Sequence, residues 1–286
     1  MAKYVPDVKT QRRVIISTAR TRRPSAAPEK KQTTFVCPFC EGNEKMTPPE
    51  VYRIGGGEKD APGWLVRVVP NKFPITDVHE VIIHSTDDTL PIERLPAEQM
   101  TRVMTAYRDR YVAHESDGQV LIFCNQGFGA GASLKHPHTQ LVVVPQQINL
   151  DSVHLEPIAN VVFEEGSFVA YCPDFSQWPY EVWIAPKQKG NKFSDVTDGN
   201  LAQLGGVLRK TLLAIEKAES DPVQEIKKPE EPFIYNYYIY HGVNWFIRII
   251  PRSVSRAGFE LGTGLNVNIV DPTIAAERLR TIIEKG

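Results

Sequence analysis

The sequence has 286 residues, of which 42% are hydrophobic and 9% aromatic, enough to build a sizeable apolar core. Its 33 basic and 34 acidic residues leave a net charge near −1, which argues against nonspecific binding to nucleic acid or to anionic membranes. The segment MAKYVPDVKT is not a secretory signal, and no run approaches about 18 apolar residues, so we expect a cytoplasmic protein without a membrane span.

Hydrophobic periodicity and turn residues predict the elements in chain order. A strand at 13–17 is followed by strands near 65–69 and 80–84, a helix over about 96–114, and strands near 119–124 and 140–145. Further strands are expected near 167–172 and 181–185, a helix near 197–217, strands near 233–240 and 244–250, and a C-terminal helix near 272–284. Pro96 and Glu98 favour a helix start at about residue 96.

The second set of elements repeats the order of the first. Residues 80–83 resemble residues 181–184, and residues 141–145 resemble residues 247–251. We therefore predict an α+β fold with mainly antiparallel sheets, built from two tandem β-β-α-β-β units. Chance similarity between strand-like segments is the alternative explanation.

The most informative segment runs from Asn125 to Gln140 and contains three glycines followed by His-Pro-His-Thr-Gln. Glycines allow close approach of the backbone to an anion, and the freed amides could hold phosphate oxygens. His136, His138 and Gln140 alternate with period two, so they are predicted to project from one face of a strand. The alternative is three ordinary buried side chains whose hydrogen bonds are satisfied.

A neutral imidazole in this setting suits nucleophilic attack on phosphorus. Histidine is mostly neutral near pH 7, and a hydrogen bond to one ring nitrogen leaves the other nitrogen with its lone pair. The product would be a nucleotidyl-histidine, which divides one difficult transfer into two easier steps.

The four cysteines fit a metal clip better than a disulfide framework. Cys37 and Cys40 are paired in Cys-Pro-Phe-Cys, whereas Cys124 and Cys172 lie in apolar runs typical of core residues.

With these motifs in order, the chain resembles the galactose-1-phosphate uridylyltransferase family, the duplicated transferase branch of the histidine-triad superfamily. The His-Pro-His-x-Gln motif is the most specific landmark, and the resemblance covers nearly the whole chain. Further landmarks are residues 12–24, Cys37–Cys40, Pro70–Pro74, His79–Ile83, Trp178–Glu181 and Ala257–Gly264. The resemblance implies two histidine-triad-like halves, a catalytic one at 1–150 and a degenerate one at 151–286.

The resemblance also implies roles for individual residues. His138 matches the nucleophile, and Gln140 matches the glutamine that contacts the phosphate of the intermediate, which favours transfer over hydrolysis. The matches to phosphate contacts are Ser133, Asn125, Gly131, Arg20 and Arg23, and those to the nucleoside side are Asn71 and Phe73.

For the metal, the resemblance implies one structural zinc ion. Cys37, Cys40 and His136 match three ligands, and either Asp88 or His84 is the fourth. A second family metal site should be empty here. Glu181 matches its glutamate, but Phe246 and Arg248 stand where its paired histidines would be.

In related enzymes a partner subunit completes the sugar pocket, so we expect a homodimer. Phe259, Glu260, Thr263 and Gly264 match that contact. The expected reaction moves UMP between a nucleotide-sugar, UDP-glucose, and a hexose 1-phosphate through nucleotidyl-His138, without nucleic acid as a substrate. One alternative is an adenylyltransferase or phosphorylase that acts on ADP-glucose, and another is a nucleotide-binding module without catalysis. Thr139 replaces the glycine of the best-studied uridylyltransferases, so galactose itself is not specified.

Overall fold

The computed structural model describes residues 3–6, 13–17, 36–148, 150, 158–221, 226 and 231–286. Arg20 and Arg23, two of the expected phosphate contacts, lie outside the described residues, and so does the start of the expected second half at residue 151. Among the described residues, no helix combines the length and apolar character needed to cross a bilayer.

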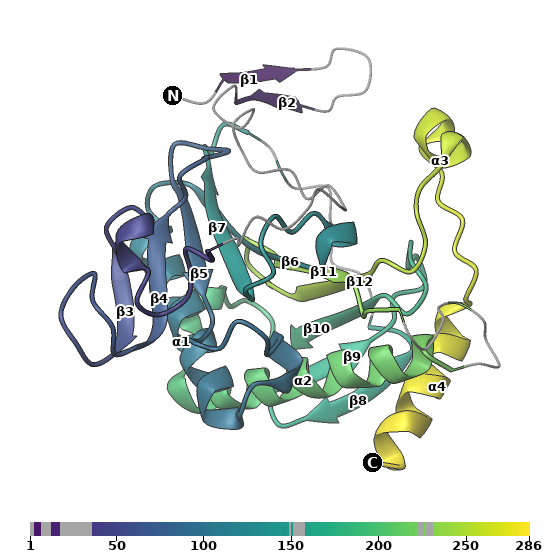
Figure 1. The fold of residues 1–286 in the computed structure, drawn as a ribbon. Helices are drawn as coiled ribbons and strands as arrows, with labels where there is room; N and C mark the ends of the chain where they lie inside the picture. The colour runs from purple at the N-terminus through teal and green to yellow at the C-terminus, as the bar shows by residue number, and fades with distance from the viewer. Residues whose placement is uncertain are drawn as a thin grey trace.

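Ten strands form one antiparallel sheet at the centre of the fold (Figure 1). Their order across the sheet is β3-β4-β5-β7-β6-β11-β12-β10-β9-β8. The strands of the first half are β3 (Tyr52–Gly55), β4 (Trp64–Pro70), β5 (His79–Ile83), β6 (Gln119–Gln126) and β7 (His138–Val144). Those of the second half are β8 (Val161–Glu165), β9 (Phe168–Tyr171), β10 (Val182–Pro186), β11 (Tyr235–Ile239) and β12 (Ile247–Pro251). A separate hairpin pairs β1 (Lys3–Pro6) with β2 (Arg13–Ile16). The antiparallel α+β fold predicted from the sequence is confirmed.

The two halves of the sheet have the same connectivity. Each contains three strands, a helix and two strands, and in each the last strand lies between the third and the fourth: β7 between β5 and β6, and β12 between β10 and β11. The halves meet where β6 pairs with β11, so one sheet runs through both. Each half has one strand more than the sequence indicated. The strands missed in the sheet, β3 and β8, lie at its two edges and are only partly buried, so they lack a clear apolar pattern. β1 of the separate hairpin was not predicted either.

Two long helices cover one face of the sheet (Figure 1). The helices are α1 (Ala97–His114), α2 (Asp198–Glu219), α3 (Gly258–Thr263) and α4 (Pro272–Glu284), with 3-10 turns at Glu44–Met46, Ile92–Arg94, Phe128–Ala130 and Phe193–Asp195. Thr197 caps α2 by accepting from the Asn200 amide, and Asp271 caps α4 ahead of Pro272. α1 and α2 pack on each other and close the main core between themselves and the sheet.

Strand periodicity separates the core face of β7 from its other face. Leu141 and Val143 join the core under the helices, so His138, Gln140 and Val142 project from the opposite face. On that opposite face the first half carries a small apolar cluster made by Phe39, Trp64, Val69, Val81 and Ile83. The polar side chains of β7 therefore stand on the face that α1 and α2 leave uncovered.

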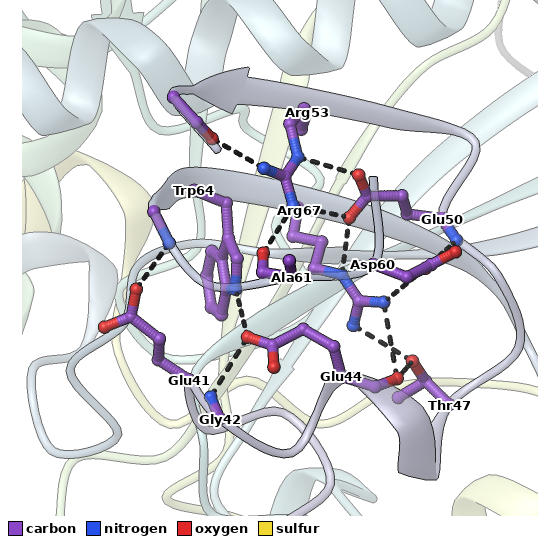
Figure 2. Close-up of polar contacts among 12 residues, drawn as sticks. Glu41, Gly42, Glu44, Thr47, Glu50, Arg53, Asp60, Ala61, Trp64 and Arg67 are labelled. Carbon is purple, nitrogen blue, oxygen red and sulfur yellow. Dashed lines mark hydrogen bonds and ion pairs between the residues drawn. The ribbon is translucent and has the colours of Figure 1, made fainter. Parts of the chain in front are cut away.

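A buried arginine, Arg67, holds the loops on either side of β3 against this face of the sheet (Figure 2). Arg67 on β4 is 1% exposed and forms ion pairs with Glu50 at 2.7 Å and with Asp60 at 2.9 Å. It also donates to the Thr47 hydroxyl at 2.9 Å, and Arg53 donates to both carboxylate oxygens of Glu50. A buried guanidinium satisfied on all sides holds its partners in fixed positions. The network thus ties the loop before β3 to the sheet.

The segment between β12 and α4, residues 252–271, is called the arm, and the short helix α3 lies at its tip (Figure 1). The arm carries large apolar side chains that are more than half exposed. They are Phe259, Leu261, Leu265, Val267 and Ile269.

Candidate active site

His138 is the first residue of β7, and its ring is held by the turn before the strand. Its Nδ1 lies 2.8 Å from the carbonyl oxygen of His136, which can only accept a hydrogen bond. Nδ1 therefore carries the proton of the neutral imidazole, and the lone pair is on Nε2. The ring also meets Phe39 edge to face, with centroids 5.3 Å apart. These contacts fix both the tautomer and the tilt of the ring.

His136 does not lie on the strand that holds His138 and Gln140, contrary to the sequence prediction. It lies in the bend at residues 135–136 that precedes β7. Its Nε2 lies 2.9 Å from the carbonyl oxygen of Ser85, so Nδ1 is left with the lone pair. The neutral rings of the two histidines thus carry their protons on different nitrogens, Nδ1 in His138 and Nε2 in His136.

The Nδ1 atom of His136 faces two thiols. It lies 3.7 Å from the Sγ of Cys37 and 3.7 Å from the Sγ of Cys40, and the three ligand atoms all lie within 4.8 Å of one another. Tetrahedral zinc with ordinary bond lengths puts sulfur and nitrogen ligands about 3.6 Å apart. The hydrogen bond to Ser85 orients the ring as metal-binding histidines require. The three residues therefore fit a tetrahedral metal ion.

Asp88 is better placed than His84 to complete this set. The Oδ2 of Asp88 lies 3.7 Å from the Sγ of Cys40. The Nε2 of His84 is instead bound to the hydroxyls of Tyr107 and Thr139, and burial holds the pKa of His84 well below its usual value. His84 is thus part of a polar network in the core under the helices.

The glycine segment turns at two residues with positive φ. Gly127 has φ 83° and Gly131 has φ 90°, values that side-chain-bearing residues rarely adopt. Asn236 on β11 holds this turn, since its Nδ2 donates to the carbonyl of Ala130 at 2.9 Å and to the Oδ1 of Asn125 at 2.8 Å. The second half of the chain therefore positions the loop next to His138.

Two cavities meet at His138. One, of about 270 Å³, lies beside Asn71 and Phe73, and the other, of about 330 Å³, lies along the glycine segment; both are lined mostly by apolar atoms. The first brings together the predicted Asn71, Phe73, Ser133, His138 and Gln140, with Phe39, Met46, Lys72, Val81 and Leu134 among its other lining residues. The second is lined by Asn125, Gly127, Lys135, His136, His138 and Phe233, among others.

Sequence reasoning did not single out the two lysines of these cavities. Lys72 and Lys135 both lie in motifs that the sequence analysis recognised. Their positive charge next to an expected phosphate-binding loop could have indicated a role in binding phosphate. The second cavity also takes Phe233 and Ile234 from the other half of the chain, which no local pattern could indicate.

The predicted residues on the arm lie apart from both cavities. Phe259, Glu260 and Thr263 belong to α3, and Gly264 ends it with a positive φ. Glu260 lines a separate cavity of about 160 Å³ with Trp178 and Arg256. In the described part of a single chain, the arm therefore lines neither of the cavities at His138.

The corresponding face of the second half is filled by an ion pair and aromatic rings. Glu181 is buried, and its Oε1 lies 2.7 Å from the Nε of Arg248 while its Oε2 accepts from Nη2 at 3.0 Å. Phe246 stacks on Trp183 with centroids 4.0 Å apart. Glu181 thus has a guanidinium partner.

The chain was compared with known proteins in sequence and in fold. Residues 76–145 match the family model of the galactose-1-phosphate uridyl transferase N-terminal domain. ADP-glucose phosphorylase from Arabidopsis thaliana is 27% identical, over 96% of this chain and 92% of that protein. Galactose-1-phosphate uridylyltransferase from Thermotoga maritima is 25% identical, over 93% of this chain and 94% of that protein.

A crystal structure of the Arabidopsis ADP-glucose phosphorylase with bound ADP-glucose matches with a TM-score of 0.73 and 26% identity, covering 98% of this chain and 99% of that one. A uridylyltransferase structure, 21% identical, shares the fold with a TM-score of 0.74, over 100% of this chain and 99% of its own. The family-model match, the two relatives and the shared fold show that the chain is similar to the galactose-1-phosphate uridylyltransferase family, and they support a nucleotidyltransferase.

Proposed function

We propose that the protein transfers a nucleoside monophosphate from a nucleotide-sugar to an acceptor phosphate through a covalent nucleotidyl-His138 intermediate. The observation that carries the proposal is the 2.8 Å contact between His138 Nδ1 and the His136 carbonyl, which puts the lone pair on Nε2. His138 lines both cavities, so a reacting phosphorus could stand between a nucleoside in one and a sugar in the other.

In the first step Nε2 attacks the α-phosphorus, an N–P bond forms, and the bond from phosphorus to the bridging oxygen breaks. The electron pair of that bond leaves with the sugar 1-phosphate. The imidazole ring then carries positive charge, which the His136 carbonyl offsets through the Nδ1 proton. In the second step an oxygen of the acceptor phosphate attacks phosphorus, the N–P bond breaks, and its electrons restore the lone pair of Nε2.

The lining residues suit this division of the substrate. The first cavity would take the nucleoside beside Asn71 and Phe73, while Ser133 and Asn125 would contact the phosphates. Gly131, which ends the glycine turn, is retained as a proposed phosphate contact through its backbone. Lys72 and Lys135 would offset phosphate charge, together with Arg20 and Arg23, which the proposal retains as phosphate contacts. The two units, 1–150 and 151–286, are proposed as a catalytic and a degenerate half.

ADP-glucose is the donor that we propose to test first. The relative that matches 96% of the chain is an ADP-glucose phosphorylase, and a phosphorylase uses inorganic phosphate as acceptor. The second candidate is UMP transfer from UDP-glucose to a hexose 1-phosphate, favoured by the Thermotoga uridylyltransferase that matches 93% of the chain.

A zinc ion held by Cys37, Cys40, His136 and Asp88 is proposed as a structural part of the site. When bound, it would neutralise the thiolates and fix the turn that precedes β7. His136 would then serve twice, since its ring faces the metal site while its carbonyl fixes His138.

A homodimer is also part of the proposal. The exposed apolar arm with Phe259, Glu260, Thr263 and Gly264 would contact a second copy near its sugar cavity.

The test is covalent labelling. The protein is incubated with ADP-glucose or UDP-glucose carrying ³²P in the α-phosphate, and acid-labile label on the chain is measured. Label from ADP-glucose supports the first donor, and label from UDP-glucose alone supports the second. His138→Ala should abolish labelling, whereas the matched change His114→Ala, on α1, should retain it. Tight nucleotide binding without label would contradict the covalent route and favour a binding module.

A further inference from the structure

His79 lies next to Gln140 on the uncovered face of the sheet. His79 pairs with Val142 across β5 and β7, and Val81 pairs with Gln140, so the two polar side chains are diagonal neighbours. Both are buried, with 4% and 5% of their surfaces exposed. The Nε2 of His79 is 3.0 Å from the Oε1 of Gln140.

The backbone fixes which nitrogen of His79 carries the proton. The amide N–H of Ile75 points at Nδ1 across 2.9 Å. A backbone N–H can only donate, so Nδ1 accepts and the proton of the neutral ring lies on Nε2. His79 consequently donates to Gln140, and Gln140 must present its oxygen to His79.

A second donor agrees with this orientation. The Oδ1 of Asn71 accepts from the Phe73 amide at 2.8 Å, which turns its Nδ2 toward the Oε1 of Gln140 at 3.5 Å. The Nδ2 of Asn71 and the Nε2 of His79 are 3.1 Å apart because both are aimed at one oxygen. Because both donors point at Oε1, the NH₂ group of Gln140 is the part of its amide left to face the cavity that His138 also lines.

We propose that His79 is a positioning residue that makes Gln140 present its NH₂ group, and not its carbonyl oxygen, to the transferred phosphoryl group. The inference rests on the proposed function and adds to it a residue that does not line the cavity. A donor aimed at phosphoryl oxygens stabilises the charge that they carry as bonds change, whereas a carbonyl oxygen there would repel them. A rotated Gln140 should thus slow nucleotidyl transfer about 10- to 100-fold while substrate binding changes little.

Two conservative replacements of His79 separate its contacts. His79→Asn keeps an oxygen near the position of Nδ1 to accept from Ile75 but has no group that reaches Gln140. His79→Gln places an amide nitrogen near the position of Nε2 and can still donate to Oε1. We expect the maximal single-turnover rate of labelling to fall about 10- to 100-fold in the Asn variant, while the substrate concentration that gives half of that rate stays unchanged. The Gln variant should recover most of the loss.

A double-mutant cycle with Gln140→Ala makes the test specific. In that background His79→Asn should cause less than about a threefold further loss, because the side chain it positions is gone. Equal losses in the two backgrounds, or wild-type rates in His79→Asn, would overturn the inference even if the wild-type chain forms nucleotidyl-His138. Failure of the wild-type chain to label would instead count against the proposed function. Should the Asn variant not fold, nitrogen NMR of the wild-type ring decides the matter, since a proton on Nδ1 is incompatible with the proposed orientation.

Discussion

Gln140 and Arg248 stand in one row across the ten-stranded sheet, separated by Phe123 on β6 and Tyr238 on β11. Each neighbouring pair in the row is a cross-strand pair, from Gln140 to Phe123, to Tyr238 and to Arg248. The row continues to Trp183 on β10. One face of a continuous sheet therefore presents a cavity with a histidine in one half and a guanidinium paired to Glu181 in the other.

Removing the guanidinium from this row should destabilise the fold. Arg248→Met leaves the buried Glu181 carboxylate without its ion pair, and breaking a buried pair costs about 3–5 kcal/mol. The free energy of unfolding, measured in urea, should fall by that amount, while kcat at low temperature stays the same because the cavities at His138 are untouched. The matched control Lys187→Met removes an exposed pair with Glu164 and should cost less than about 1 kcal/mol. Equal effects of the two changes would contradict the role of Arg248.

Zinc content should depend on the Cys37, Cys40 and His136 cluster. Cys40→Ser removes a thiolate ligand, so the metal bound per chain after purification with zinc should drop from about one to a small fraction. Elemental analysis measures the content, and thermal unfolding should show a lower Tm in the same variant. Cys172→Ser changes a buried cysteine of the second half and serves as the control. Full zinc content in Cys40→Ser would refute the assignment.

The Glu80–His114 pair predicts a stability that depends on pH. The Glu80 carboxylate accepts a hydrogen bond from His114 Nε2 at 2.9 Å and so raises the pKa of His114, and Asp117 acts in the same direction. A raised pKa contributes stability that is complete below the unfolded value, about 6.5, and is lost as pH rises through the folded value. Urea unfolding should show a larger difference between wild type and His114→Gln at pH 6 than at pH 8.5. A difference that grows with pH would reverse the expected sign.

Thr139 and the three polar side chains that it contacts in the core should act as one unit. The Tyr107 hydroxyl lies 2.5 Å from the Thr139 hydroxyl, 2.7 Å from the Tyr237 hydroxyl and 2.9 Å from His84 Nε2, all in the core under α1. Tyr107→Phe should destabilise the protein by about 1–3 kcal/mol, because buried partners lose a hydrogen bond. Combining it with Tyr237→Phe should cost less than the sum of the single changes, as measured by urea unfolding. Strict additivity would show that the hydroxyls are independent.

The main elements could be predicted from the sequence because each had a strong local signal. The predicted helix at 96–114 is observed at Ala97–His114, and the C-terminal helix at 272–284 is observed as predicted, since both have clear starts and apolar periodicity. The edge strands β3 and β8 gave no such signal, because edge residues need not alternate. The exact start of β7 was also missed, and with it the separate position of His136.

Polar contacts between residues far apart in the chain could not be predicted from the sequence. Nothing local indicates that Arg67 meets Glu50 and Asp60, or that Asn236 holds the glycine turn from the other half of the chain. His79 was recognised only as part of a landmark, because its contact with Gln140 depends on strand register. The motif identified the neighbourhood of the site, whereas pairing across the sheet decides which side chains orient it.

The seam between β6 and β11 has a consequence for how the chain can be divided. Five residue pairs join the strands there, from Tyr235 with Gln126 to Ile239 with Ile122. Separating the halves would bare a row of backbone amides and carbonyls in the middle of the molecule, a surface that pairs readily with other chains. Either half expressed alone should therefore associate with other chains through this strand edge and not remain a monomer.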